Sequence, residues 1–265
     1  MNQFSLNKKR KYLIIAVLGL IVMGSFILVQ DRKPILYIVG DSTVKNGDGK
    51  GRDTLWGWGS FMDSHFDTSR IEVQNHAIGG RSTRTFITDN RWSKILTTLQ
   101  KGDYVIIQFG HNDASPLDDT ARARGTLKGI GDDSVEIYNP IKKIKEVVHS
   151  YGWYLRKFIN EAKQVGAIPI ICSPVPRNNF TNGKINRSLD YAVWAKEICD
   201  QTQTNFIDLH NLIADKYDQL GENKVNQFFP KDHTHTNLEG ALLNTDVVID
   251  AIKKSKAGAL KNYLQ

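Results

Sequence analysis

The segment ILYIVGDST, Ile35 to Thr43, decides the fold class. Its first five residues are uncharged, apolar and rich in β-branched side chains, and Gly40 ends the run, which is typical of a strand buried within a parallel sheet. Four further short runs alternate with stretches of helical period. The predicted strands span residues 35–39, 71–75, 104–109, 168–172 and 205–209.

Helices are predicted around and between these strands. The expected helices span residues 58–66, 91–100, 151–165, 189–201, 212–220 and 238–254. Residues 114–150 break the alternation, and a loop of this length inside a compact domain is usually functional or disordered. The sequence therefore predicts one three-layer α/β/α domain over residues 32–265, flavodoxin-like, with a five-stranded parallel sheet and one long loop.

Composition and charge exclude several classes of protein. The chain has 265 residues, is 40% hydrophobic and contains no repeat or low-complexity stretch, so disordered and solenoid architectures are excluded. The formal net charge of +7 comes largely from Lys8, Lys9, Arg10 and Lys11, because residues 31–265 hold 31 bases against 28 acids. Both signs are interleaved there, so we expect no nucleic-acid partner. We also expect a monomer.

The four basic residues precede an apolar run from Leu13 to Val29. This order is typical of a secretory signal, and the run is also close to the length that spans a bilayer. Residues 1–31 are therefore predicted to be either a cleaved signal peptide or a membrane anchor. Because the basic cluster stays on the cytoplasmic side, the rest of the chain is expected outside the cytoplasm, periplasmic or secreted.

Small or polar residues follow each of the first four predicted strands. The clusters are Gly40 to Thr43, Gly79 to Ser82, Gly110 to Asp113 and Ser173 to Asn178. Taken singly, each is explained by a helix cap or a tight turn. Because open parallel sheets bind ligands at the carboxyl ends of their strands, we expect the clusters to converge in space.

Asp232 and His235 are three residues apart, so one short turn can present both side chains on the same side. A serine nucleophile needs such a base and an orienting carboxylate, and Ser42 follows the first strand. Acyl transfer also needs donors for its oxyanion, which the N–H groups of Ser42 and Gly80 and the side-chain amide of Asn112 can supply. These residues together predict an acyl-transfer site.

The same blocks resemble those of the SGNH (GDSL-like) hydrolases. The matching blocks are GDST at residues 40–43, the glycine at Gly80, GHND at residues 110–113 and D-x-x-H at residues 232–235. Within that superfamily the chain is most similar to the rhamnogalacturonan acetylesterases. That likeness rests on NHAIGGRSTRTF at residues 75–86, KGDYVIIQFGHND at residues 101–113 and FPKDHTHTNLEGA at residues 229–241.

The resemblance covers residues 35 to about 254 and implies a role for each matching residue. Ser42 would be the nucleophile, His235 the general base and then acid, and Asp232 the carboxylate that orients it. Ser42, Gly80 and Asn112 would supply the oxyanion hole. The resemblance implies no metal and no organic cofactor. The interval 114–150 and the N-terminal apolar run depart from the shorter members of the family.

A metal-dependent deacetylase is one alternative, because His233 and His235 form an H-x-H pair. The other candidate ligands, His76, His111 and His210, have no spacing that completes a known ligand set. The serine interpretation uses more of the motifs at once.

An inactive sugar-binding protein of the same fold is the second alternative. The aromatic residues that could stack on sugars are Trp56, Trp58, Trp153, Tyr151 and Tyr154. Loss of catalysis normally removes the nucleophile or the base, and both are present here. Cys172 and Cys199 are predicted to be buried free thiols, although an oxidising compartment leaves a disulfide open.

Four arginines are expected to line the mouth of the site: Arg81, Arg122, Arg124 and Arg177. Guanidinium groups suit the planar carboxylates of galacturonate through paired hydrogen bonds, whereas a neutral xylan offers no such group. Taken one at a time, each could instead be a surface charge. With the family resemblance, these residues predict an acetylated pectic polysaccharide, rhamnogalacturonan, as the substrate, with another polysaccharide such as xylan as the alternative.

The basic cluster and the apolar run predict the topology of the chain. A reporter fused after Asp31 should show alkaline phosphatase activity, because that enzyme folds only outside the reducing cytoplasm. Fluorescence from a reporter that folds only in the cytoplasm would contradict this orientation.

Overall fold

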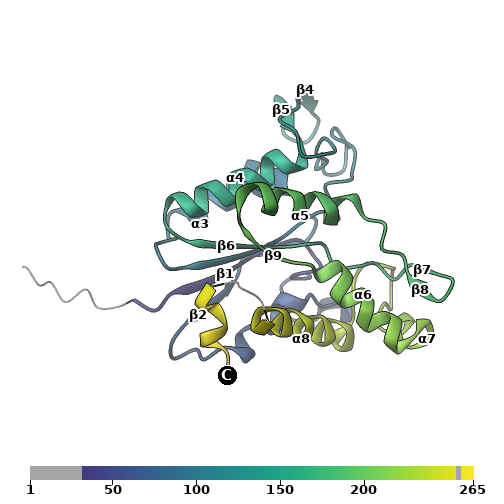
Figure 1. Ribbon diagram of the computed structural model, residues 1–265. Helices are drawn as coiled ribbons and strands as arrows, with labels where there is room; N and C mark the ends of the chain where they lie inside the picture. Colours follow the sequence, from purple (N-terminus) through teal and green to yellow (C-terminus); the bar gives the residue numbers. More distant parts are fainter. Residues whose placement is uncertain (1–31, 255–257) are drawn as a thin grey trace, which may run out of the picture. The chain divides into compact units, whose positions relative to one another are not determined.

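Five parallel strands form the central sheet of the computed structural model, which describes residues 32–254 and 258–265 (Figure 1). Their order is β2-β1-β3-β6-β9, and every neighbouring pair is parallel. The strands span Ile35–Gly40 (β1), Glu72–Asn75 (β2), Tyr104–Gln108 (β3), Ile168–Cys172 (β6) and Asn205–Ile207 (β9). All five predicted strands are confirmed, with ends that differ by at most two residues.

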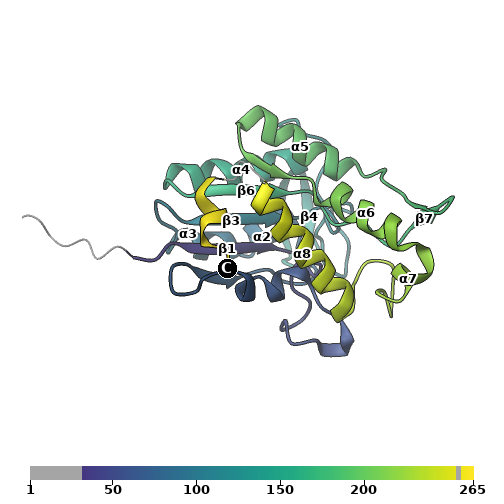
Figure 2. The same cartoon turned by 60° about the horizontal axis from the view of Figure 1, so that its bottom comes forward.

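Helices cover both faces of this sheet because its strands are apolar on both sides. Leu36 and Ile38 of β1 belong to one buried hydrophobic cluster, and Tyr37 and Val39 belong to a second cluster on the opposite face. The first cluster is covered by α6 (Leu209–Leu220) and α8 (Leu238–Lys254), and the second by α3 (Arg91–Leu96), α4 (Tyr151–Gln164) and α5 (Asp190–Thr202) (Figures 1 and 2). The three-layer α/β/α prediction is confirmed.

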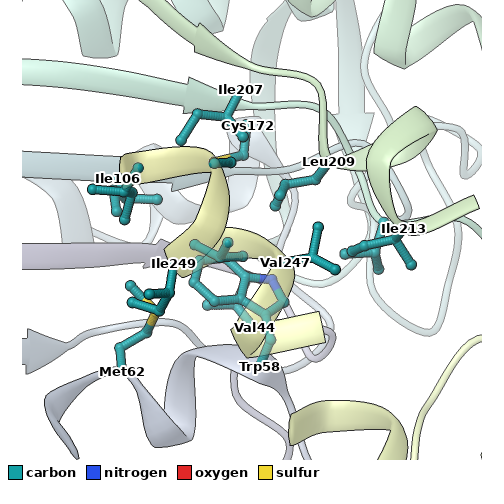
Figure 3. Packing of buried hydrophobic residues seen from close by; sticks show 14 of the residues in the cluster. Val44, Trp58, Met62, Ile106, Cys172, Ile207, Leu209, Ile213, Val247 and Ile249 are labelled. Atoms are coloured by element: carbon teal, nitrogen blue, oxygen red, sulfur yellow. The ribbon is translucent and has the colours of Figure 1, made fainter. Parts of the chain in front are cut away.

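Trp58 lies in the middle of the first hydrophobic cluster (Figure 3). Ile106 and Cys172 of neighbouring strands and Ile249 of α8 belong to the same cluster, and all of them are almost fully buried. Burying a side chain of this size contributes roughly 1.5–3 kcal/mol relative to leaving it exposed. The indole Nε1 of Trp58 donates to Oε1 of Gln108 at 2.9 Å, so its polar atom is satisfied as well.

The helix predicted over residues 58–66 is replaced by two 3₁₀ turns. The N–H of Gly59 donates to the carbonyl of Val44. A side chain on Gly57 would lie 2.3 Å from the Val44 carbonyl carbon. This close packing against the turn after β1 holds the segment in a tighter geometry than an α-helix. The turns span Trp58–Phe61 and Asp63–His65.

Several short elements were not foreseen in the sequence. They are α2 (Thr83–Thr88), α7 (Glu222–Asn226), β7 (Phe180–Thr181) paired with β8 (Lys184–Ile185), and 3₁₀ turns at Arg52–Thr54 and Gly258–Tyr263. Helix α2 begins with a capping box between Ser82 and Thr85, in which each hydroxyl accepts from the backbone N–H of the other residue. Helices this short lack the two full turns that make a hydrophobic period visible.

Residues 114–150, expected as one long loop, contain an antiparallel hairpin (Figure 1). Strand β4 (Ser134–Asn139) pairs with β5 (Ile144–His149). The expectation of a single loop was wrong here. Val135 and Ile137 alternate with polar residues, and this period of two is the signal that indicates the first strand.

Arg84 of α2 holds this hairpin against the domain. The guanidinium is fully buried and donates from Nε and Nη2 to both carboxylate oxygens of Glu146 in β5, at 2.8 and 2.9 Å. Nη1 donates to the carbonyls of Leu117 and Gly125. The charge and its donors are therefore satisfied by two separate parts of the 114–150 interval, as a buried arginine requires.

The predicted signal or anchor segment, residues 1–31, lies outside the described residues. Within residues 32–254 and 258–265, no helix combines the length and the apolar character needed to cross a bilayer.

The buried pair predicts a large effect of Glu146→Ala on stability. The substitution leaves the Arg84 guanidinium buried without its counter-charge, which costs about 3–5 kcal/mol. Urea unfolding followed by tryptophan fluorescence measures the loss. The control is Glu136→Ala, because Glu136 on the same hairpin is half-exposed and pairs with Lys145. That change should cost less than about 1 kcal/mol, and equal losses in the two variants would contradict the assignment.

Candidate active site

The polar residues that follow the strands converge, as the sequence predicts. Gly40 pairs with Gln108 and Gln108 pairs with Cys172, so the carboxyl ends of β1, β3 and β6 lie level. The chain places β2 on one side of β1 and β3 on the other, which makes a topological switch point at the ends of β1 and β3. Open α/β sheets bind ligands at such points. Ser42 follows β1 at this position.

Ser42, His235 and Asp232 form one hydrogen-bonded chain. The Ser42 Oγ lies 2.8 Å from Nε2 of His235. The other ring nitrogen, Nδ1, lies 2.7 Å from Oδ2 of Asp232. The serine comes from the turn after β1, and the other two residues come from the loop before α8. Ser42 and His235 are 193 positions apart in the sequence. This arrangement has the geometry of a nucleophile, a base and an orienting carboxylate.

The Asp232 carboxylate fixes the tautomer of His235. Partial burial by itself would raise the pKa of Asp232, but hydrogen bonds from the His235 ring and from the N–H groups of His235 and Thr234 outweigh it and lower the pKa to about 2. The ionised carboxylate only accepts, so Nδ1 carries a proton. In neutral His235, Nε2 then presents its lone pair to the Ser42 hydroxyl.

The predicted oxyanion donors lie beside this chain. Gly80 has φ +74°, a left-handed conformation that favours glycine. A side chain on Gly79 would lie 3.6 Å from the Ser42 Cβ, so the glycine turn packs against the serine. Within the described part of the chain, the N–H groups of Ser42 and Gly80 donate to no other group. The Asn112 amide donates to the carbonyl of Arg81 at 2.8 Å, which holds it next to the same turn.

Four polar side chains to which the sequence analysis gave no role in the serine site hold the nucleophile turn, and they are Asp41, Thr43, Gln108 and His111. The Asp41 carboxylate accepts from the N–H and hydroxyl of Thr43, at 2.9 and 2.8 Å, and faces Nδ1 of His111 at 3.3 Å. Burial would raise the pKa of Asp41, but His111 and Thr43 lower it. The Gln108 amide donates to the Thr43 hydroxyl at 2.7 Å. Only packing reveals these contacts.

The four arginines predicted at the mouth do not share one location. Arg81 and Arg122 line a cavity of about 230 Å³ that begins at Gly80. Arg177 lines a different cavity of about 250 Å³. Arg124 is half-buried, and its Nη1 lies 3.5 Å from the carbonyl oxygen of Gly80. Three of the four therefore gather around Gly80, and Arg177 lies by the other cavity, which Gly110 and His111 also line.

The residues that could serve sugar stacking or metal binding are for the most part not placed for those roles. Trp58, Tyr151 and Tyr154 are buried and cannot stack on a sugar, while Trp56 and Trp153 are partly exposed. His233 has an exposed side chain. Among residues 32–254 and 258–265, no group of three or more His, Cys, Asp or Glu side chains is placed to hold a metal ion.

Cys172 and Cys199 are both buried and free, as predicted. Burial raises the pKa of both thiols, that of Cys199 to about 12. Neither thiol has the thiolate character that a nucleophile needs.

Comparison with known proteins identifies the family. The family model described as "GDSL-like Lipase/Acylhydrolase family" matches residues 38–243, which include the serine turn, the glycine turn and the loop before α8. The chain belongs to this family. The family resemblance predicted from the sequence motifs is confirmed.

Curated relatives of this GDSL-like chain include a rhamnogalacturonan acetylesterase of Emericella nidulans, 33% identical over 82% of this chain and 84% of that protein. The probable rhamnogalacturonan acetylesterase YesY of Bacillus subtilis is 31% identical over 83% of this chain and 92% of that protein. Among solved structures, YxiM of Bacillus subtilis has a TM-score of 0.68 at 24% identity. The match covers 84% of this chain and 57% of the longer YxiM chain. At this identity the likeness supports the fold alone.

Asp113 next to Asn112 predicts a pH-dependent stability. Burial raises its pKa to about 7, partly offset by hydrogen bonds from Thr83, and its Oδ2 has no partner among the described residues. The folded protein therefore holds this proton while the unfolded chain releases it near pH 4, so stability falls as pH rises from about 4 to about 7. Asp113→Asn removes this titration.

The unfolding free energy of Asp113→Asn relative to wild type should therefore increase by up to about 1.4 kcal/mol per pH unit in that window. Urea unfolding at pH 4.5, 5.5 and 6.5 measures it, and all other titrating groups cancel in the difference. Parallel curves for the two proteins would show that Asp113 is ionised throughout.

Proposed function

We propose that the protein is a carbohydrate esterase that removes acetyl groups from acetylated rhamnogalacturonan through a serine acyl-enzyme. The observation that carries the proposal is the chain Ser42–His235–Asp232, with contacts of 2.8 and 2.7 Å. The glycine turn of Gly79 and Gly80 packs against Ser42, and the Asn112 amide donates to Arg81 in that turn. Ser42, Gly80 and Asn112 follow the carboxyl ends of the strands, where open α/β sheets bind ligands.

The proposed reaction has two halves. Ser42 Oγ attacks the acetyl carbonyl carbon while Nε2 of His235 takes its proton, and the tetrahedral oxyanion accepts hydrogen bonds from the N–H groups of Ser42 and Gly80 and from Asn112. Collapse breaks the bond to the sugar oxygen, which receives the proton from His235. A water molecule, deprotonated by His235, then attacks the acetyl-serine, and acetate leaves as the serine regains its proton.

Asp232 remains ionised throughout this cycle, because its pKa is about 2. Its charge stabilises the imidazolium that forms at His235 in both halves and keeps the ring in one orientation. No metal or organic cofactor takes part in the proposed reaction. A metal-dependent deacetylase would need a ligand set around His233 and His235.

The substrate assignment rests on the curated relatives and on charge. Two relatives at 31% and 33% identity are named as rhamnogalacturonan acetylesterases, the former as probable. Acetylated xylan is the alternative substrate, since the fold is shared with an acetylxylan esterase of Geobacillus stearothermophilus at a TM-score of 0.53 and 19% identity. We further propose that the enzyme acts outside the cytoplasm, from the basic and apolar order of residues 8–29.

Ser42→Ala should fold normally and lose several orders of magnitude in the hydrolysis of 4-nitrophenyl acetate, because the nucleophile is absent. Asn112→Ala should lose about 100- to 1,000-fold in kcat, since one of three oxyanion donors is removed. Near wild-type hydrolysis by Ser42→Ala would refute the acyl-enzyme. Loss of wild-type activity in a chelator, regained with added Zn²⁺, would favour the metal-dependent alternative.

A panel of acetylated polysaccharides tests which one is the preferred substrate. Acetate release from acetylated rhamnogalacturonan should be faster than from neutral acetylated xylan (free of glucuronate branches) or mannan at equal acetyl concentration, because only the first of these carries uronate carboxylates for the cationic groups near Gly80. Faster release from xylan would overturn the pectic assignment and leave the esterase chemistry intact.

A further inference from the structure

A cavity with an excess of positive charge begins at Gly80 and extends under the tip of the β4–β5 hairpin. Its volume is about 230 Å³. Its lining has three cationic side chains and a single carboxylate, which are Arg81, Arg122, Lys142 and Asp89. We refer to it as the cationic cavity. Gly80, the predicted oxyanion donor, is one of its lining residues, and the glycine turn packs on Ser42.

The single carboxylate of the cavity, that of Asp89, already forms ion pairs with two of its cationic side chains. Oδ2 of Asp89 lies 3.0 Å from Nε of Arg81, and Oδ1 lies 3.3 Å from Nζ of Lys142. Lys142 also donates to the carbonyl of Thr88 at 2.8 Å. Within the described residues Arg122 forms no hydrogen bond or ion pair with any group. The cavity therefore has a net positive charge and an unpaired guanidinium at its rim.

Two guanidinium groups converge on Gly80. A side chain built on this glycine would lie 2.3 Å from Nη1 of Arg122 and 3.6 Å from Nη1 of Arg124. Burial lowers the pKa of Arg124, and the nearby charge of Arg122 lowers it further, while Asp119, Asp41 and Asp113 act in the opposite direction. Two like charges this close are stabilised by an anion that bridges them.

The loop that carries Arg122 is held in place by hydrogen bonds from Arg84 and by one within the loop. The buried Arg84 donates to the carbonyls of Leu117 and Gly125, at each end of the loop. Between them, the N–H of Ala123 donates to the carbonyl of Asp119 at 2.8 Å. The backbone on either side of Arg122 is thus held by contacts of the loop, while the Arg122 side chain is exposed.

We propose that the cationic cavity binds the carboxylate of a uronic acid residue of the polysaccharide, with Arg122 as the principal contact and Lys142 as a second one. This proposal rests on the proposed function, because it places the acetylated sugar at Ser42. A planar carboxylate matches the two parallel donors of a guanidinium, and Nζ of Lys142 adds a point charge on the hairpin side. The cavity therefore favours acidic polysaccharides as substrates. The catalytic residues Ser42, His235 and Asp232 themselves act on any accessible acetyl ester.

The test compares two substrates that differ only in charge. One is a rhamnogalacturonan oligosaccharide, and the other is the same oligosaccharide with its carboxyl groups reduced to alcohols, both acetylated chemically to the same degree. The enzymes are the wild type, Arg122→Gln, Lys142→Gln, Arg122→Lys and the control Arg70→Gln. Arg70 is exposed and precedes β2, at the amino end of the sheet away from the site. Hydrolysis of 4-nitrophenyl acetate is measured in parallel.

Arg122→Gln should reduce kcat/KM on the acidic oligosaccharide by about 10- to 100-fold, mainly through KM, because a charge-assisted hydrogen bond is lost. Lys142→Gln should have a smaller effect of the same kind, and Arg122→Lys should restore part of the activity. On the reduced oligosaccharide and on 4-nitrophenyl acetate, which lack the carboxylate, the loss should be several-fold smaller in each of these variants. Arg70→Gln should match the wild type on every substrate.

Two outcomes would overturn the proposal. Equal kcat/KM of the wild type on the acidic and reduced oligosaccharides would show that the cavity does not bind a carboxylate. A fall in kcat on 4-nitrophenyl acetate with Arg122→Gln, as large as the fall on the oligosaccharide, would place the guanidinium at the oxyanion. If the wild type hydrolyses no acetate ester, the proposed function fails, and calorimetric titration of the wild type with the unacetylated oligosaccharide, against Arg122→Gln, still tests the cavity alone.

Discussion

A chain of hydrogen bonds between buried polar side chains fixes the turn that carries Ser42, and the site depends on it. The Trp58 indole donates to Gln108, the Gln108 amide donates to the Thr43 hydroxyl, and that hydroxyl donates to Asp41. Every member is at least 94% buried, so an unsatisfied group anywhere in the chain would be costly. The chain links β3, the 3₁₀ segment and the turn after β1 into one unit.

This unit explains why the serine meets a histidine from the far end of the chain. Trp56, next to the 3₁₀ segment, exchanges backbone contacts with Thr236, which directly follows His235. The Thr236 hydroxyl also donates to the Trp56 carbonyl at 3.1 Å. The loop before α8 is thereby held against the same segment that supports the serine turn. The 2.8 Å contact between Ser42 and His235 follows from this shared support.

On the other side of the serine, a second buried group organises the part of the chain that departs from a plain α/β domain. Arg84 connects α2 to β5 and to the loop that carries Arg122. Its position next to the glycine turn couples the hairpin to the oxyanion side of the site. The Ser42–His235–Asp232 contacts are thus held by the sheet and its connections, and the two residues that we propose to bind a uronate carboxylate, Arg122 and Lys142, are held by the 114–150 interval.

The sequence by itself determined the sheet, the site motifs and the family, because each depends on the order of residues within a short contiguous segment. A buried strand such as β1 is continuous and apolar, and Asp232 and His235 lie on one turn at a fixed spacing. The short helix α2, the pairing of β4 with β5 and the separation of Arg177 from the other arginines came only from the tertiary structure. A six-residue helix has no visible period, and the fate of an arginine depends on partners that are distant in the sequence. Arg84 and Arg122 look alike as residues of a polar segment, but packing buries one against Glu146 and leaves the other exposed over Gly80.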